Sequence, residues 1–254
     1  AIYPMFAENR RTERRYDIIE MLKRDYRVQD IIDYSGLEPD GLYLEGTGAM
    51  VLDHIDRVAY AIKSNRTDPV ALERFCTHFN YEPMVFDALD ETGTPIYHTN
   101  VLMCIATNFV MIGLDMIIDV QRRQEIVDRF ESSGRHVIAL TNDQIANFAG
   151  NALELQGNNG RVLALSSTAY KALTNDQLEL IERSTTILPL DIPTTEMAIP
   201  ASGKTYNVSS DTTVLMTATS KDMTMSIGLG SASSAGAITA GNVLWNDNSA
   251  TSGI

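Results

Sequence analysis

Short apolar runs alternate with amphipathic charged runs from Ile2 to about Met197. Runs of β-branched and aromatic residues predict strands, and apolar positions three and four apart predict helices. By these rules a strand pair, a helix and a further strand follow one another about three times, at spacings of roughly 45 to 50 residues. The pattern predicts an α/β fold made from a repeated supersecondary unit rather than a doubly wound sheet.

Helices are expected over residues 14–26, 67–81, 121–134 and 174–185. The first has an apolar stripe that consists of Ile18, Ile19, Leu22 and Tyr26. The second has Thr67 or Asp68 as its cap and Pro69 in its first turn. Strands are expected at 2–6, within 42–62, at 82–89, within 96–117, and at 136–140, 162–166 and 186–190.

The composition changes after Met197. Residues 198–254 contain ten Ser and eight Thr but no Glu or Arg, and residues 204–230 alternate as antiparallel strands do. We therefore expect two parts, an α/β body at 1–197 and a Ser/Thr-rich tail at 198–254. The tail should be β over 205–229, with its strand added to an open edge of the body, and mostly irregular over 231–254.

The formal net charge of −13 argues against nucleic acid or an anionic membrane surface as a partner. Two cysteines make no disulfide framework, so a reducing cytoplasm is the expected compartment. No apolar run reaches the ~18 residues of a membrane span. The first residues, "AIYPMF", resemble a core strand, and we expect a further N-terminal part to be missing.

Two short signals indicate chemistry. In "LEGTG", residues 44–48, Glu45 is placed in a turn between glycines that allow close backbone approach. His98 lies on a predicted strand, with Asn100 two residues on and on the same face. A carboxylate that orients a histidine is one part of a nucleophile–His–carboxylate site. A turn glutamate and an unrelated strand histidine would give the same spacing.

Neither cysteine is a good candidate for the nucleophile. Six strand residues at ~3.3 Å each put Cys104 roughly 20 Å from His98. Cys76 lies on the apolar stripe of a predicted helix, where a small buried side chain is usual. No spacing suggests a metal site, and structural or surface roles are expected for the remaining histidines, His54, His78 and His136.

Several segments together resemble the amidinotransferase or guanidine-modifying superfamily: "YPMFAENRRTERR", "LEGTGAMVLDH", "YHTNVLMCIATNF", "NDQIANFAGNALEL" and "IPTTE". The resemblance covers about residues 2–197 and is greatest to dimethylarginine dimethylaminohydrolases and citrulline-utilisation hydrolases. It implies a pentein fold, an α/β propeller of ββαβ modules around a pseudo-fivefold axis, here incomplete. It also implies a cysteine nucleophile that attacks a guanidinium or ureido carbon, without a cofactor.

By this resemblance His98 is the general acid/base and Glu45 its carboxylate partner. Asn100 stands where relatives have a substrate-binding aspartate. The arginines of "NRRTERR" belong to a loop that lies near the substrate's carboxylate in relatives; they are Arg10, Arg11, Arg14 and Arg15. The implied substrate is citrulline, arginine or a methylated arginine.

One departure from the family is decisive for activity. Relatives have the nucleophilic cysteine shortly after the segment that matches "IPTTE", whereas no cysteine follows Glu196 here. Three hypotheses remain: a hydrolase seen as an incomplete or spliced chain, a non-catalytic pentein body fused to a β-rich binding or assembly segment, and a chain joined from two unrelated sources. A homo-oligomer is compatible with each.

Overall fold

The computed structural model describes residues 1–191 and the strand segments 204–208, 213–219, 224–230, 232–233 and 237–238. Three small sheets form the body, each of three strands in sequence order. They comprise β1 (Met50–Asp53), β2 (Val58–Ile62) and β3 (Glu82–Phe86); β4 (Met103–Ile105), β5 (Phe109–Ile112) and β6 (His136–Ala139); and β7 (Leu153–Gly157), β8 (Gly160–Ser166) and β9 (Thr186–Leu190).

Each sheet is one ββαβ module. Its first two strands pair antiparallel, and its third strand lies parallel to the second after a helical crossover. The crossovers contain α3 (Pro69–Phe79), α5 (Val120–Ser132), and α7 (Ser167–Ala172) with α8 (Asn175–Glu182). The repeated unit predicted from the periodicity is therefore confirmed.

The helix caps agree with the sequence pattern. At α3 the side chain of Asp68 accepts hydrogen bonds from the backbone N–H of Val70 and Ala71, and Pro69 is the first helical residue. Asp119 caps α5 in the same way. Because these side chains satisfy N–H groups that have no partner within the helix, they fix where each crossover begins.

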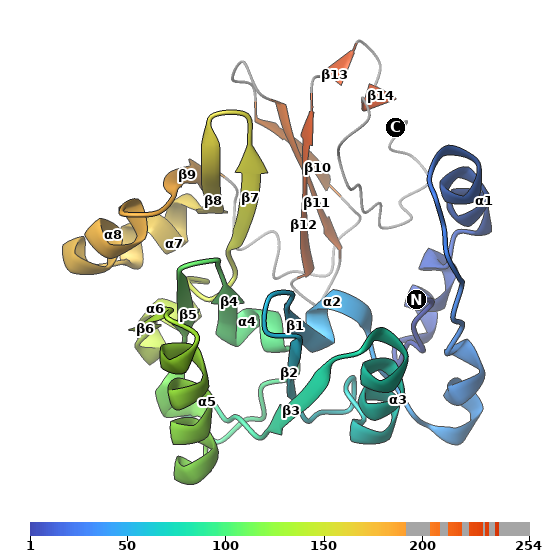
Figure 1. Ribbon diagram of the computed structural model, residues 1–254, viewed down its shortest axis with the longest axis horizontal. Helices are drawn as coiled ribbons and strands as arrows, with labels where there is room; N and C mark the ends of the chain where they lie inside the picture. Colours follow the sequence, from blue (N-terminus) through green and yellow to red (C-terminus); the bar gives the residue numbers. More distant parts are fainter. Residues whose placement is uncertain (192–203, 209–212, 220–223, 231, 234–236, 239–254) are drawn as a thin grey trace.

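A short helix precedes the first strand of each module: α2 (Gly46–Ala49), α4 (Thr99–Leu102) and α6 (Asn142–Ala146). Figure 1 shows α2 and α4 near the middle of the molecule, with α3 and α5 toward its periphery. The strand predicted across residues 96–104 is wrong in its first part, because α4 interrupts it. The distance between His98 and Cys104 inferred from an extended strand therefore does not apply.

Buried side chains hold the modules together. Every residue of β2 and β5 is buried, and the rings of Tyr60 and Phe130 stack with their centroids 4.8 Å apart. Arg135 binds Asp53 and Asp56 of the β1–β2 turn and also the backbone oxygen of Ala106. This arginine thus joins the first module to the second.

The N-terminal segment has part of the same pattern. Ile2 and Asp33 form a parallel bridge on either side of α1 (Tyr16–Asp25). The predicted helix is confirmed, but none of its residues is buried; Leu22 is 40% exposed and the following Tyr26 54% exposed. Two further turns, η1 (Glu8–Glu13) and η2 (Ser35–Asp40), are 3-10 helices, as is η3 (Leu114–Met116).

The described tail is β, as predicted. Strands β10 (Lys204–Val208), β11 (Thr213–Thr219) and β12 (Thr224–Gly230) form an antiparallel sheet, and β13 (Ala232–Ser233) pairs with β14 (Ala237–Ile238). In the described strands the pairing is within the tail, so the predicted addition to an edge of the body is wrong for them. The domain boundary at 197, and most of 231–254, lie outside the described residues.

No described helix is both long and apolar enough to cross a membrane. Among the described residues no group of three or more His, Cys, Asp or Glu side chains is arranged to hold a metal ion.

Candidate functional site

Glu45 lies at the start of α2, where two neighbouring segments fix the backbone. The N–H of Leu44 donates to the oxygen of Pro4 at 3.0 Å, and the N–H of Glu45 donates to the oxygen of Arg66 at 3.0 Å. Gly46 follows with φ +61, a conformation that glycine adopts at little cost. The turn directs the carboxylate inward, and its side chain has no exposed surface.

His98 occupies the equivalent place at the start of α4 and is fully buried. Its Nε2 lies 3.5 Å from Oε2 of Glu45. A Cβ on Gly48 would be 2.9 Å from both Cε1 and Nδ1 of the imidazole, so only glycine leaves room for the ring. The "LEGTG" motif therefore supplies both the carboxylate and the space for the histidine that it contacts.

Thr99 joins the two short helices. Its Oγ1 accepts a hydrogen bond from the N–H of Ile62 at 2.8 Å and donates one to the oxygen of Ala49 at 2.6 Å. Thr99 is fully buried, so both bonds are shielded from water. The hydroxyl fixes the start of α4, and with it His98, against α2. No motif in the sequence distinguishes Thr99 as a structural residue.

The Glu45 carboxylate is surrounded by donors. Oε1 accepts from the N–H of Ala7 at 3.0 Å, and Oε2 accepts from Nη1 of Arg66 at 2.9 Å and Nη1 of Arg10 at 3.3 Å. Burial alone raises the pKa of Glu45, but the contact with His98, the Ala7 N–H and the two arginines outweigh it and lower the pKa to about 2. The carboxylate is ionised at neutral pH.

Arg66 has aromatic rings on two sides. Its guanidinium carbon is 5.2 Å from the ring centre of Tyr97 and 5.9 Å from that of Phe6, and the Tyr97 ring packs 4.9 Å from the ring of His98. Such contacts stabilise a guanidinium. No motif in the sequence marks Arg66 as a site residue. Its position in the turn directly after β2 is the one sequence feature that could have indicated a role at the site.

The four predicted arginines have different partners. Only Arg10 reaches Glu45, and it is buried. Arg11 and Arg14 bind Glu38, whose Oε1 also accepts the N–H of Met5. Arg15 pairs with Asp17, and both are well exposed. The segment around η1 is thus anchored to two carboxylates, Glu45 and Glu38.

Asn100 lies inside α4 and is half-buried. Within the described part of the chain its amide oxygen is buried without a hydrogen-bond partner. The expectation that it shares a strand face with His98 is wrong, because Asn100 lies within the helix that His98 caps. Its role in substrate binding stays a prediction.

Both cysteines are buried and protonated at neutral pH. Burial, with the charge of Glu73 in addition, raises the pKa of Cys76 to about 11. Burial, with the charge of Glu154 in addition, raises the pKa of Cys104 to about 12. Because the thiolate is the nucleophile, neither residue is prepared for attack.

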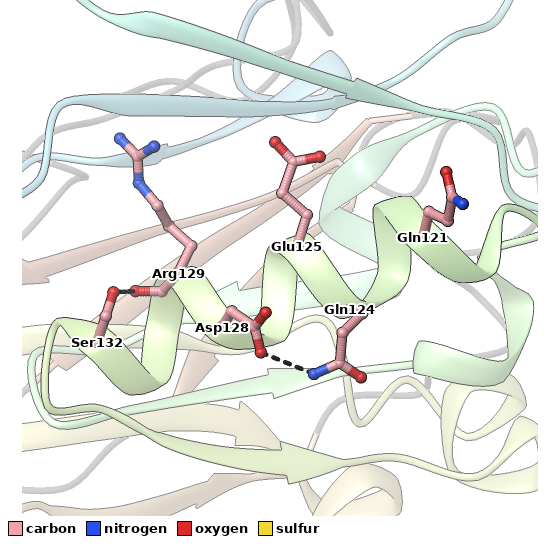
Figure 2. Close-up of a pocket in the computed structure, with 6 residues that line it drawn as sticks. All are labelled: Gln121, Gln124, Glu125, Asp128, Arg129 and Ser132. Carbon is pink, nitrogen blue, oxygen red and sulfur yellow. Dashed lines mark hydrogen bonds between the residues drawn. The ribbon is translucent and has the colours of Figure 1, made fainter.

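Figure 2 shows a shallow pocket along the outer face of α5. Inside it Nε2 of Gln124 donates to Asp128 at 2.7 Å, and the Ser132 hydroxyl donates to the oxygen of Arg129. The pocket is a solvated polar helix face that contains none of the predicted site residues. Six residues line it: Gln121, Gln124, Glu125, Asp128, Arg129 and Ser132.

The family model of eukaryotic N,N dimethylarginine dimethylhydrolases matches residues 1–199. The chain belongs to this family. No curated protein gives a match. Among solved structures, this dimethylhydrolase-family chain is similar to the product-bound N-terminal domain of ArgZ, an arginine dihydrolase from the ornithine–ammonia cycle in cyanobacteria. The two are 16% identical, with a TM-score of 0.54, and the match covers 74% of this chain.

A complex of an AgrE variant with L-arginine is also similar, at 18% identity and a TM-score of 0.56 over 77% of this chain. The match spans 61% of the ArgZ domain and 26% of that AgrE chain. These similarities establish the fold. The family match over residues 1–199 confirms the predicted membership of the superfamily.

Proposed function

We propose that the chain provides the acid/base half of a hydrolase that acts on the guanidino or ureido carbon of an arginine-type amino acid. The observation that carries this proposal is the buried pair of His98 and Glu45, 3.5 Å apart, with the carboxylate held ionised by Arg10 and Arg66. A buried imidazole beside a permanent anion can exist as the imidazolium that donates a proton. Family membership supports the substrate class.

The proposed reaction runs through a covalent thiouronium-type intermediate. A cysteine thiolate forms a C–S bond to the guanidino or ureido carbon, and the C–N bond to the amine breaks as the amine takes a proton from His98. Water then attacks the same carbon and gives a proton to His98, and the C–S bond breaks with its electron pair returning to sulfur. Glu45 orients the imidazole and stabilises its charged form throughout.

Neither cysteine of these 254 residues is suited to be the attacking thiol of this reaction. The sequence contains two cysteines, and burial keeps both protonated. Loss of a nucleophile typically lowers the rate of a hydrolase by ~10⁶-fold. The chain should therefore bind its substrate without turning it over.

Substrate contacts are proposed for the polar groups that surround the pair. Arg10 and Arg66 are placed beside the carboxylate, and Asn100 offers a buried amide oxygen. Arg11, Arg14 and Arg15 would first have to leave Glu38 and Asp17. We further propose a cytoplasmic location, because Cys76 and Cys104 are free thiols and thiols stay reduced in the cytoplasm.

Calorimetric titration with L-citrulline, L-arginine, agmatine and N,N-dimethylarginine tests the proposal, together with assays for released ammonia and dimethylamine. We expect one of the amino acids to bind one-to-one, more weakly in His98→Ala, with no product above background. Failure of all four to bind would contradict the proposal. Turnover that disappears in Cys104→Ser or Cys76→Ser would contradict the conclusion that neither cysteine acts as the nucleophile.

A second function is favoured by the tail. Strands β10, β11 and β12 pair among themselves, as an appended binding or assembly segment would. On this hypothesis the body does not catalyse and the tail holds copies of the chain together. Light scattering of the full chain across a range of concentrations decides it: self-association lost on deletion of residues 198–254 supports assembly, and a monomer throughout excludes it.

A further inference from the structure

The same spacing to the first strand recurs in all three modules, although Glu45 and His98 precede a short helix and Phe148 follows one. Glu45, His98 and Phe148 each lie five residues before that strand, which starts at Met50 in β1, at Met103 in β4 and at Leu153 in β7. The first two of these positions hold the acid/base pair. The third module therefore presents a phenylalanine where its neighbours present the glutamate and the histidine.

The third segment also contacts the second, although through a different position from the one that joins the second to the first. His98 lies against Gly48, and Thr99 bonds the oxygen of Ala49. One module further on, Gly150 lies so close to α4 that a Cβ on it would be 2.5 Å from the oxygen of Val101. This contact sets the turn that contains Phe148 and Gly150 against the last residues of α4, the helix that His98 caps.

Phe148 has an unusual backbone conformation. Its φ is +65, in the left-handed region, directly after the end of α6. The N–H of Phe148 donates to the oxygen of Ile145, and the N–H of Ala149 donates to the oxygen of Gln144. These two bonds form a Schellman motif, whose left-handed position is usually glycine. A bulky side chain there is an outlier, and such outliers cluster at functional sites.

Core packing does not account for the phenyl ring. The two hydrophobic clusters of the described residues include or contact Phe75, Phe79, Phe86, Phe109 and Phe130 but not Phe148. The ring is half-buried, neither core nor fully exposed surface. A strained aromatic residue outside the core, in register with the acid/base pair, is suited to contact a ligand.

We propose that Phe148 forms an aromatic wall of the substrate site beside His98, and that it selects cationic guanidino ligands over neutral ureido ligands. The inference rests on the proposed function, since it assumes that the pair marks a substrate site. An aromatic face attracts a guanidinium through its quadrupole, whereas an uncharged urea gains only dispersion. The ring thus makes arginine and methylated arginines better ligands than citrulline.

Titration of wild type and Phe148→Leu with L-arginine and L-citrulline tests this selectivity. Leucine keeps an apolar side chain and the backbone strain but has no π face. We expect the Kd for arginine to rise about two- to thirtyfold, the range of a cation–π contact, and that for citrulline to change less than ~twofold. Equal effects on the two ligands, or no effect on arginine, would overturn the proposal.

Phe148→Gly separates a ligand contact from a structural role. Glycine removes the strain of the left-handed position, so the Tm should stay the same or rise while arginine binding weakens. A lower Tm would show that the ring supports the fold and would overturn the proposal. Asn80→Gly is the matched control, because Asn80 has φ +54 at the end of α3, and this variant must bind arginine normally.

The two proposals fail in different ways. If wild type binds neither amino acid, the proposed function and the role of Phe148 fail together. If wild type binds arginine and Phe148→Leu binds it equally well, only the role of Phe148 fails.

Discussion

Replacement of Gly48 by alanine perturbs the acid/base pair through space alone. The new Cβ would lie 2.9 Å from Cε1 and Nδ1 of His98 and 3.2 Å from Nε2. Ordinary contacts begin near 3.4 Å, so the ring or the helix must shift by about half an ångström. Since Nε2 is already 3.5 Å from Glu45, a shift of this size separates the pair.

Gly36→Ala isolates the size of this effect. Gly36 lies in η2, nothing is within 4 Å of the position of its Cβ, and its φ is not positive. Both substitutions restrict the backbone of the unfolded chain to the same extent. This restriction stabilises the folded state by about 0.4–1 kcal/mol in each variant. Overpacking of a filled site costs about 1–3 kcal/mol. We therefore expect Gly48→Ala to be less stable than Gly36→Ala by about 1–3 kcal/mol.

Urea denaturation of the two variants measures this difference. Nitrogen-15 NMR of the His98 ring reports whether the contact of Nε2 with Glu45 is lost in Gly48→Ala and kept in Gly36→Ala. Equal stabilities within about 0.5 kcal/mol, the usual range of surface substitutions, together with an unchanged ring signal, would refute the close packing of His98 on Gly48.

Three further predictions concern stability, each measured by urea denaturation. Arg135→Ala removes the charge partner of the buried Asp53 and of the half-buried Asp56 and should cost about 3–5 kcal/mol, whereas Arg129→Ala removes an exposed pair and should cost about 0–1 kcal/mol. Thr99→Val leaves a buried N–H without a partner and should cost about 1–3 kcal/mol, while Thr99→Ser keeps the bonds. Because the pKa of Glu45 falls from 4.5 to about 2 on folding, its stabilisation is complete above pH 4.5 and is lost as the pH falls toward 2. Glu45→Gln should therefore flatten the decline in stability between about pH 4.5 and pH 2.

Each of these has a clear contrary result. Equal losses in Arg135→Ala and Arg129→Ala would show that the module-joining ion pair is not buried in solution. Equal stabilities of Thr99→Val and Thr99→Ser would show that the Thr99 hydroxyl does not stabilise the start of α4. A pH profile unchanged in Glu45→Gln would mean that this carboxylate titrates normally in the folded protein.

The module repeat could be predicted because each of its elements has a local cause. Alternating and continuous apolar runs define the strands, and Asp68 with Pro69 marks the start of α3. Burial was less predictable. The stripe on α1 has the helical period, yet whether Leu22 is covered depends on what packs against it, and in the described chain it stays 40% exposed.

The site could be predicted in part. Glu45 and His98 each lie in a short motif that the sequence shows, "LEGTG" and "YHTNV". The glycines of "LEGTG" indicated that another segment packs closely against this backbone. The short helix α4 was missed because Val101 and Leu102 favour a strand, and the helix depends on contacts of Thr99 with residues far away in sequence. Arg66 was missed for the same reason: its partner Glu45 is 21 residues away.

A crystal structure of the chain with bound L-arginine or N,N-dimethylarginine would show whether the substrate lies against His98 and Glu45. We expect the leaving nitrogen of the guanidino group to lie within hydrogen-bond reach of the His98 ring, at ~2.6–3.2 Å, with Glu45 still in contact with Nε2. A ligand bound elsewhere on the chain, with the pair of His98 and Glu45 untouched, would contradict it.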